Sequence, residues 1–441
     1  MIYLLTCILV CLLLLFYWIN KGDAFSPSFI FAASFTFSTL WACIYADKWN
    51  LELHQNTFNV ICGGVLEFGV VCLIVHLAST VFKKNRTNYW VRSETSLIYI
   101  QRGKLYLFIA FEIVTILLTI RFLLRASSGS NLAAAMFMYR NQLDAFAKNI
   151  GMPSYVSWPR VCVNAAGYWF AYILANNYLA TKKVPKLELV IVVLSAVSGT
   201  MLGGRGNIVF LILAIAVFYW ILLHKSRSPK DAKVSFKGVV ITVATVAVLI
   251  ISFQNLGNLL GRSSTANPMD YLATYFGAEI KNLDSVLQVG LHKNSHYFGE
   301  QTFINLYKWI GSITGNSDFL NLNFATQFNS INGYNLGNVY STFYSFYYDL
   351  GYTGVIIFVL IMAIICQGIY EHIIASDDIG KHITLMVLFG YIFNAIVFSF
   401  FSNKFYEQLF SGAAFYSILF WQLFCLFFIK VKFRVSKEVR G

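Results

Sequence analysis

Charge is what this sequence conspicuously lacks. Only 12% of its 441 residues are Asp, Glu, Lys or Arg, whereas 58% are hydrophobic and the mean hydropathy is +0.63. A soluble protein needs more charge to cover its surface, so this composition is typical of a chain that lies in lipid. The eight cysteines fall in apolar runs without paired CxxC spacing, which indicates neither a zinc site nor a disulfide framework.

Several catalytic signatures are also missing. The sequence contains no HExxH, GxSxG, P-loop or GxGxxG motif, and it has no DxD-type aspartate cluster. These absences give no support to a metalloprotease or a nucleotide-dependent mechanism. We therefore expect no metal and no cofactor.

The hydrophobic runs predict eleven transmembrane helices, because a span needs about 20 apolar residues. The N-terminal run lacks a cationic region and a small-residue cleavage site, so we interpret it as a span and not as a removable signal. The expected spans are roughly 2–20, 27–45, 57–81, 105–121, 161–181, 187–202, 207–223, 238–254, 352–372, 383–401 and 410–429.

The net charge of +13 follows membrane topology and does not indicate nucleic-acid binding. One set of loops holds 21 of the 33 Lys and Arg residues, and short basic loops stay in the cytoplasm. The N-terminus is therefore expected outside and the C-terminus inside. The basic set comprises 21–26, 82–104, 182–187, 224–237, 373–382 and 430–441.

Two long outer loops interrupt a single membrane domain, 1–441. The first spans 122–160 and the second spans 255–351. Loops of this length in a compact domain are usually functional or disordered. The second is rich in aromatic and branched residues, so we expect it to form short helices that pack back onto the bundle.

The hairpin "GTMLGGRGNIVF" (199–210) places a permanent charge between two predicted spans. The glycines around Arg205 let the backbone approach a ligand, and Gly204 and Gly206 lie near the start of the next helix. The guanidinium group grips phosphate through two parallel hydrogen bonds. The hairpin therefore indicates an anion-binding tip, although a turn with an arginine that reaches lipid phosphates would look the same.

Other polar residues also need a partner or a role. The outer arginines are not explained by topology. The amides and aromatics of the second loop form a composition that binds sugars, although a solvated loop would look similar. Glu67 and Glu112 lie inside predicted spans, where we expect structural hydrogen bonding. The outer arginines are Arg121, Arg125, Arg140, Arg160, Arg205 and Arg262.

These segments together resemble a known family. "SGTMLGGRGN" is similar to the Ser/Gly-x6-Arg-Gly segment of bacterial oligosaccharide repeat unit polymerases, the Wzy-type O-antigen polymerases. "YSFYYDLGYTG" resembles the segment that leads into a late span of that family, and "HYFGEQTFINLYKWIG" and "KNLDSVL" resemble the stretch before it. Arg140 and Gly151 match its Arg-x10-Gly pattern, whereas fourteen residues separate Arg262 from Gly277.

The resemblance implies an α-helical, GT-C-like glycosyltransferase that is metal-independent and inverting. Such enzymes work at the periplasmic face of the bacterial inner membrane. They transfer a growing chain from undecaprenyl diphosphate to the non-reducing end of a new lipid-linked repeat unit. Implied partners are this lipid-linked oligosaccharide, as donor and acceptor, a chain-length regulator and a flippase, but no nucleic acid.

Roles for individual residues follow from this chemistry. A diphosphate is a good leaving group, so the site needs cations for the developing charge and a base for the acceptor hydroxyl. We expect Arg205, Arg140 and Arg262, with Gly204 and Gly206, to bind the diphosphate. Asp349 is the first candidate for the base, because it lies where the second loop returns to the membrane; a helix cap is the alternative. The reserve candidates for the base are His296 and Glu279, and the expected sugar contacts are Tyr347, Tyr348 and Asn338.

Three other functions remain possible from the sequence. An O-antigen ligase shares the fold and the donor. A lipid-linked oligosaccharide flippase predicts charges along the spans, which are nearly charge-free here. A chain-length partner usually has two spans around a coiled coil and not eleven.

Overall fold

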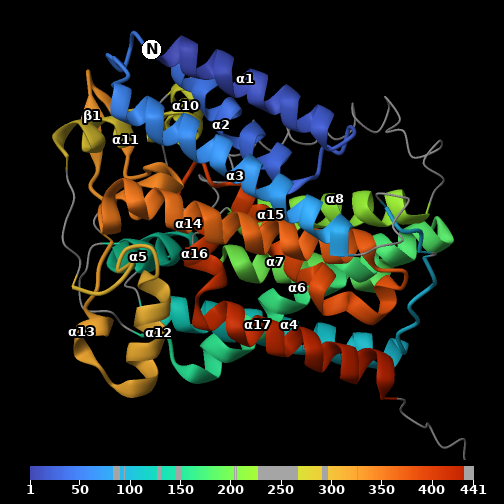
Figure 1. Ribbon diagram of the computed structural model, residues 1–441. Helices are drawn as coiled ribbons and strands as arrows, with labels where there is room; N and C mark the ends of the chain where they lie inside the picture. The colour runs from blue at the N-terminus through green and yellow to red at the C-terminus, as the bar shows by residue number, and fades with distance from the viewer. Residues whose placement is uncertain are drawn as a thin grey trace, which may run out of the picture.

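The apolar runs of the sequence fold into long helices (Figure 1). The computed structural model describes residues 1–82, 90–93, 95–126, 131–144, 151–202, 204, 206–226, 267–290, 296–324 and 326–431. The longest helices are α1 (Ile2–Ile19), α2 (Pro27–Ile44), α3 (Gln55–Phe82), α4 (Arg102–Ala126), α6 (Ser154–Thr181), α8 (Gly206–Ser226) and α14 (Ser341–Ala375).

Shorter elements complete the fold. A single antiparallel hairpin, β1 (Asn329–Ile331) and β2 (Tyr334–Gly337), is the sheet structure of the described chain. A 3-10 turn, η1 (Ile379–His382), precedes α15, and a π-helical turn, η2 (Cys425–Lys430), extends α17. The short helices are α5 (Leu132–Asp144), α7 (Lys186–Thr200), α10 (Pro268–Phe276), α11 (Ala278–Val289), α12 (Ile304–Thr314), α13 (Ser317–Leu320), α15 (Ile383–Val397), α16 (Lys404–Leu409) and α17 (Gly412–Phe424).

Seven helices of the described chain are long and apolar enough to cross a membrane, which makes this a helical, multi-pass membrane protein by length and composition. They are α1, α2, α3, α4, α8, α14 and α17 with η2. Three of the eleven predicted spans do not form helices that meet this criterion of length and apolar composition. The helices α7 and α15 have only 15 residues each, and α6 begins at Ser154, inside the predicted first loop, and is too polar to qualify. The predicted span 238–254 lies outside the described residues.

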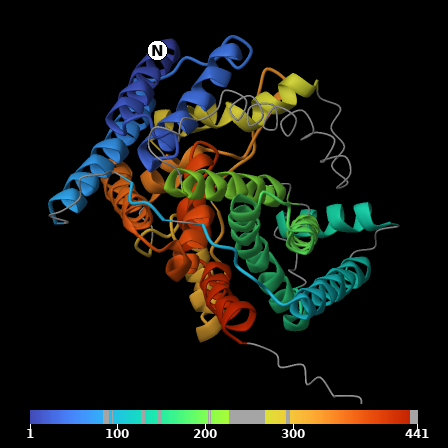
Figure 2. The ribbon, with the colours of Figure 1, turned by 90° about the vertical axis from the view of Figure 1, so that its right-hand side faces the viewer.

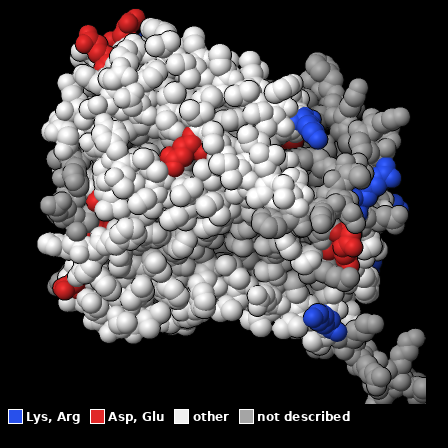
Figure 3. Space-filling view, in the orientation of Figure 1, with Lys and Arg blue, Asp and Glu red and all other residues white. Residues whose placement is uncertain are grey.

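One end of the bundle, which we call the basic end, gathers the predicted basic loops. The Tyr370 hydroxyl donates to the Asp23 carboxylate, and the Asn176 amide donates to the Ser96 carbonyl at 2.8 Å. Lysines and arginines visible in Figure 3 lie at this end, on the right, and the surface between the two ends is largely uncharged. The basic end comprises 20–26, 90–93, 95–104, 176–186, 220–226, 370–382 and 426–431.

The opposite end, which we call the loop end, is built from segments that are far apart in sequence. The Tyr45 hydroxyl donates to Asp270 at 2.8 Å, and the Asn403 amide donates to the Thr302 carbonyl at 3.1 Å. Helices α10–α13 and the hairpin lie here, on the left of Figure 1. The loop end comprises 44–54, 121–126, 131–144, 151–160, 199–202, 204, 206, 267–290, 296–324, 326–351 and 398–411.

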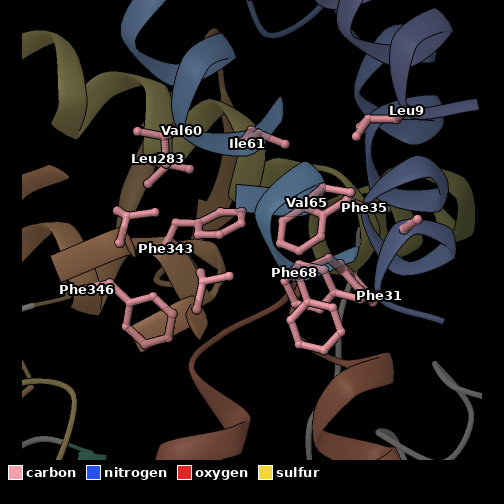
Figure 4. Close-up of a cluster of buried hydrophobic side chains, with 14 of the residues drawn as sticks. Leu9, Phe31, Phe35, Val60, Ile61, Val65, Phe68, Leu283, Phe343 and Phe346 are labelled. Carbon is pink, nitrogen blue, oxygen red and sulfur yellow. The ribbon is translucent and has the colours of Figure 1, made fainter. Parts of the chain in front are cut away.

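Aromatic packing holds the bundle together. The Phe31 and Phe68 rings stack with centroids 4.1 Å apart, and Phe35 stacks on Phe343 at 4.9 Å (Figure 4). These contacts join α2, α3 and α14, and Leu283 of α11 lies against the same cluster. Figure 2 shows the orange and red helices, among them α14 and α17, in the middle of the molecule, with α1–α3 on one side and α4–α6 on the other. The loop-end helices are thus attached to the same core as the spans.

The two carboxyl groups in the spans do not make the hydrogen bonds that we expected. Glu112 is completely buried, and neither of its side-chain oxygens has a partner among the described residues. Glu67 is half-buried, and no hydrogen bond to its side chain is present in the described chain. A buried carboxyl group without partners is costly when charged, so Glu112 fits this position only as the neutral acid.

At the basic end, Lys225 ties three segments together. Its ammonium group donates to four carbonyl oxygens, those of Val91, Ile373, Ile374 and Ser376, at 2.7–3.1 Å. The residue is only 1% exposed. A single cation thus satisfies carbonyls at the C-terminus of α14, where the helix leaves them unpaired.

We predict that Lys225→Met lowers the stability of the purified protein by roughly 2–3 kcal/mol, because charge-assisted hydrogen bonds to buried carbonyls are lost. The measurement is the thermal unfolding midpoint in detergent. Lys183→Met, at an exposed position of the same end, is the matched control and should not change the midpoint. Equal midpoints for both variants would contradict the role of Lys225.

Candidate functional site

Two arginines line a hollow at the loop end, at the C-terminus of α4. Arg121 and Arg125 are one helical turn apart and therefore share a face. Together with Phe122 and with Tyr155 of α6 they surround about 460 Å3. Within the described chain, neither guanidinium group has a carboxylate within 4.0 Å. Both positive charges are therefore available to an anion.

The elements around this arginine hollow carry further predicted arginines. Helices α4, α5, α6 and the end of α7 meet in one apolar cluster, which includes Phe122, Tyr139 and Met201. Arg140 is half-buried on α5. Arg160 of α6 is 4% exposed and donates to the Thr119 hydroxyl at 3.4 Å. Packing therefore gathers four outer arginines onto neighbouring elements, which their spacing in the sequence did not indicate.

The glycine hairpin connects α7 to α8 beside this cluster. Helix α8 begins at Gly206, so its first amide groups face the hairpin, as the sequence predicted. The Asn207 amide donates to the Gly199 carbonyl at 2.5 Å and closes the base of the hairpin. Gly204 is described, whereas Arg205 lies outside the described residues. Arg262 also lies outside them, so the expected diphosphate contacts of both remain predictions.

A second hollow, the acidic–aromatic pocket, lies between α13, the turn before α12 and α14. It encloses about 590 Å3. Two predicted site residues, His296 and Tyr348, line it, and Glu300 is a lining carboxylate that sequence reasoning did not select. The other lining residues are Tyr297, Gln301, Asp318, Asn321, Leu322, Asn323 and Phe324. Carboxylates, amides and rings of this kind can bind sugar hydroxyls and stack on sugar rings.

Tyrosines on one face of α14 lead to this pocket. The rings of Tyr340 and Tyr344 lie 4.8 Å apart, and those of Tyr344 and Tyr348 lie 5.7 Å apart. Tyr347 points elsewhere and meets Tyr352 edge-on at 5.3 Å. Asn338 is exposed after β2 and lines none of the hollows described here. Of the three expected sugar contacts, the structure therefore places only Tyr348 in a pocket.

Asp349 is buried and holds a turn. Its carboxylate accepts hydrogen bonds from the Gln301 amide at 2.9 Å, the Thr302 amide at 2.8 Å and the Thr302 hydroxyl at 2.7 Å. A kink follows at Gly351, whose φ of 62° is strained for any residue with a side chain. The carboxylate thus fixes Glu300 and its neighbours against α14. The hydrogen bonds described here go to the turn before α12, whereas the alternative considered from sequence was a cap at the start of a span.

Glu279 is remote from the acidic–aromatic pocket. It is fully buried on α11, where one oxygen accepts a hydrogen bond from Ser38 of α2 and the other has no partner among the described residues. Burial raises the pKa of Glu279 to about 8. The structure therefore does not bring together the three base candidates: only the His296 side chain lines a pocket.

An aromatic bridge joins the two hollows across the loop end. Tyr155 lines the arginine hollow, and one turn later Trp158 packs on Tyr416 with centroids 4.3 Å apart. Trp309 of α12 lies 5.2 Å from Phe415 in the same group. The cationic and acidic sites are thus both lined by segments of the loop end.

Comparisons with protein family models, with curated proteins and with solved structures each found no match for this chain. Among the described residues, no group of three or more His, Cys, Asp or Glu side chains is arranged to hold a metal ion. The functional assignment therefore rests on the residues themselves.

We predict that Asp349→Asn costs roughly 1–3 kcal/mol of stability, because an amide nitrogen cannot accept from the Thr302 backbone and leaves a buried donor unpaired. His296→Gln, at an exposed position in the adjoining pocket, should leave the thermal midpoint unchanged. If the two variants unfold at the same temperature as wild type, the carboxylate does not anchor this turn.

The stability of the protein should fall as the pH rises from about 5 to about 8, and Glu279→Gln should flatten this dependence. Over that range the folded state keeps the proton on Glu279, whereas the unfolded chain, with an ordinary pKa of 4.5, releases it. Midpoints measured across this range provide the test. The control, Glu52→Gln at an exposed position, should retain the wild-type slope.

Proposed function

We propose that this protein is an O-antigen polymerase that joins undecaprenyl-diphosphate-linked repeat units at the periplasmic face of a bacterial inner membrane. One observation carries the proposal. The arginine hollow and the acidic–aromatic pocket are both lined by residues of the loop end of a multi-span bundle, opposite the basic end. Such an arrangement suits a substrate with an anionic lipid-linked part and a neutral sugar part.

The proposed architecture is GT-C-like, with about eleven membrane segments. The N-terminus and the loop end face the periplasm, and the C-terminus faces the cytoplasm, in accordance with the positive-inside rule. The short helices α7 and α15 count as segments buried among their neighbours; Ile191 and Met386 are fully buried. A chain-length regulator and a flippase are the proposed partners.

In the proposed reaction, the bond between the sugar C1 carbon and the phosphate oxygen of the donor breaks, and undecaprenyl diphosphate leaves with the electron pair. Arginine side chains stabilise the charge that develops on it, and no metal is required. We add Arg121 and Arg125 to the predicted Arg205, Arg140 and Arg262 for this role. The acceptor hydroxyl attacks the opposite face of the sugar, which inverts the configuration.

The hydroxyl proton goes to a base in the acidic–aromatic pocket. His296 is the base candidate that lines the pocket, with Glu300 beside it at 8% exposure. Asp349 acts in this scheme by fixing the turn that carries Glu300. Both lining groups can reach a ligand, whereas Asp349 and Glu279 are enclosed by protein.

Deleting the gene in the native host should collapse the ladder of surface lipopolysaccharide to core plus one repeat unit, because units are still made, flipped and ligated but not joined. A gel of the lipopolysaccharide is the measurement. Loss of the single-unit band as well, with accumulation of lipid-linked units, would replace the proposal with a ligase or a flippase. Complementation with wild type restores the ladder, and His296→Gln at equal protein level should not.

A further inference from the structure

A third cavity lies inside the bundle, below the glycine hairpin. It has a volume of about 240 Å3 and is enclosed by α6, α7, α8, α15, α16 and α17. Two of its lining residues, Gly199 and Asn207, flank the hairpin, and Gln408 brings α16 of the loop end into the wall. We call it the inner cavity. It shares no lining residue with the arginine hollow or the acidic–aromatic pocket.

The wall of the inner cavity combines apolar side chains with amide and hydroxyl groups and carries no charged side chain. The lining residues are Val161, Asn164, Tyr168, Ser195, Gly199, Asn207, Phe210, Leu211, Tyr391, Gln408, Ala413 and Ser417. Some of these polar groups are already used: Ser195 donates to the Val163 carbonyl at 2.7 Å, and Ser417 donates to the Ala413 carbonyl at 2.8 Å. The Ser195 hydroxyl thus joins α7 to α6, whereas the Ser417 hydroxyl bonds within α17.

Three other groups in the wall are uncommitted. The Gln408 side-chain carbonyl is buried and has no partner among the described residues. Neither the Asn164 amide nor the Tyr391 hydroxyl makes a hydrogen bond within the described chain. Amides and hydroxyls in protein interiors are normally paired, so three that converge on one cavity indicate a ligand that supplies donors and acceptors.

A hydrogen-bond network behind the wall of the inner cavity holds its aromatic rings in place. Asn394 is fully buried, and its amide donates to the Tyr168 hydroxyl at 3.2 Å and to the Phe210 carbonyl at 3.0 Å. The Tyr168 ring meets the Tyr391 ring edge-on at 5.2 Å. Two phenol rings are thus held in place at the cavity, which is a preorganised surface for the CH face of a sugar.

The chemistry of the wall selects among ligand classes. A charged ligand would lose its hydration without gaining an opposite charge. A hydrocarbon chain would leave the Gln408 and Asn164 side chains unpaired, which is costly. A neutral, polyhydroxylated ring satisfies the amides through its hydroxyl groups and the phenol rings through its CH groups. The volume equals about eight times the roughly 30 Å3 that one water molecule occupies in the liquid.

We propose that the inner cavity binds one neutral sugar unit of the oligosaccharide substrate, through Asn164, Tyr391 and Gln408. This inference rests on the proposed function and adds a site that is separate from the acidic–aromatic pocket. Because Gly199 and Asn207 flank the hairpin, the bound unit is the one nearest the diphosphate. The inner cavity would therefore select the first sugar of the repeat unit, whereas the acidic–aromatic pocket binds the acceptor.

The test measures binding of the repeat-unit oligosaccharide, released from the host's own surface polysaccharide, to the purified full-length protein in detergent. Saturation-transfer NMR suits the weak affinity of sugars. Asn164→Leu and Gln408→Leu should each weaken binding about tenfold, as expected for the loss of about 1.4 kcal/mol. Gln422→Leu, at an exposed position on α17, is the matched control and should bind as wild type does.

Tyr391→Phe removes only a single oxygen atom. It therefore keeps the test valid if the leucine variants misfold. It should also weaken binding while leaving the thermal midpoint unchanged. Wild-type affinity in all three variants overturns the inference. Absence of binding to the wild-type protein overturns it too, and this is the result expected if the cavity holds only water. If the deletion strain keeps its ladder but the variants still lose binding, the proposed polymerase is wrong and the sugar site stands.

Discussion

The bundle depends on one constraint: the hydrocarbon layer contains no water, so every polar group at that depth needs a partner inside the protein. Charged side chains are accordingly moved to the two ends or enclosed. Lys225 is enclosed by four carbonyls at the basic end, and Lys104 donates to the carbonyls of Phe427 and Val431 near the C-terminus. At the loop end, the Asp349 carboxylate does the same for backbone amides. Each of these three side chains completes the hydrogen bonding of backbone groups near the end of a helix.

Hydropathy predicted the long helices because a continuous apolar run is a local property. It did not predict that α6 begins at Ser154 or that α15 ends at Val397, since contacts with distant segments set these boundaries. The contacts of the loop end were harder to predict from sequence than these helix boundaries. Its folding depends on pairs such as Asp284 with His54 and Thr57, which are more than 200 residues apart in sequence. Composition indicated that this loop would be ordered, but nothing in it specified those partners.

For the candidate site, residue type was a better guide than position. His296 was selected as a reserve candidate for the base and Tyr348 as a sugar contact, and both line a pocket. Asn338, also selected as a sugar contact, is exposed directly after β2 and lines none of the hollows described here. Arg121 and Arg125 stood out in the sequence only as outer arginines. Their shared hollow depends on how Tyr155 of α6 packs beside α4, which a single sequence does not encode in readable form.

The separation of charges at the loop end has a consequence for any anionic substrate. Had Glu300 or Asp318 been placed beside Arg121, ion pairs would neutralise the arginines and lower their attraction for phosphate. Instead, the arginine hollow and the acidic–aromatic pocket share no lining residue, and the lining of the arginine hollow contains no carboxylate. In the proposed reaction this spacing lets a diphosphate meet unpaired cations while the acceptor hydroxyl meets an unpaired base. In this scheme the rings of the aromatic bridge supply a surface along which the sugars between the two groups can lie.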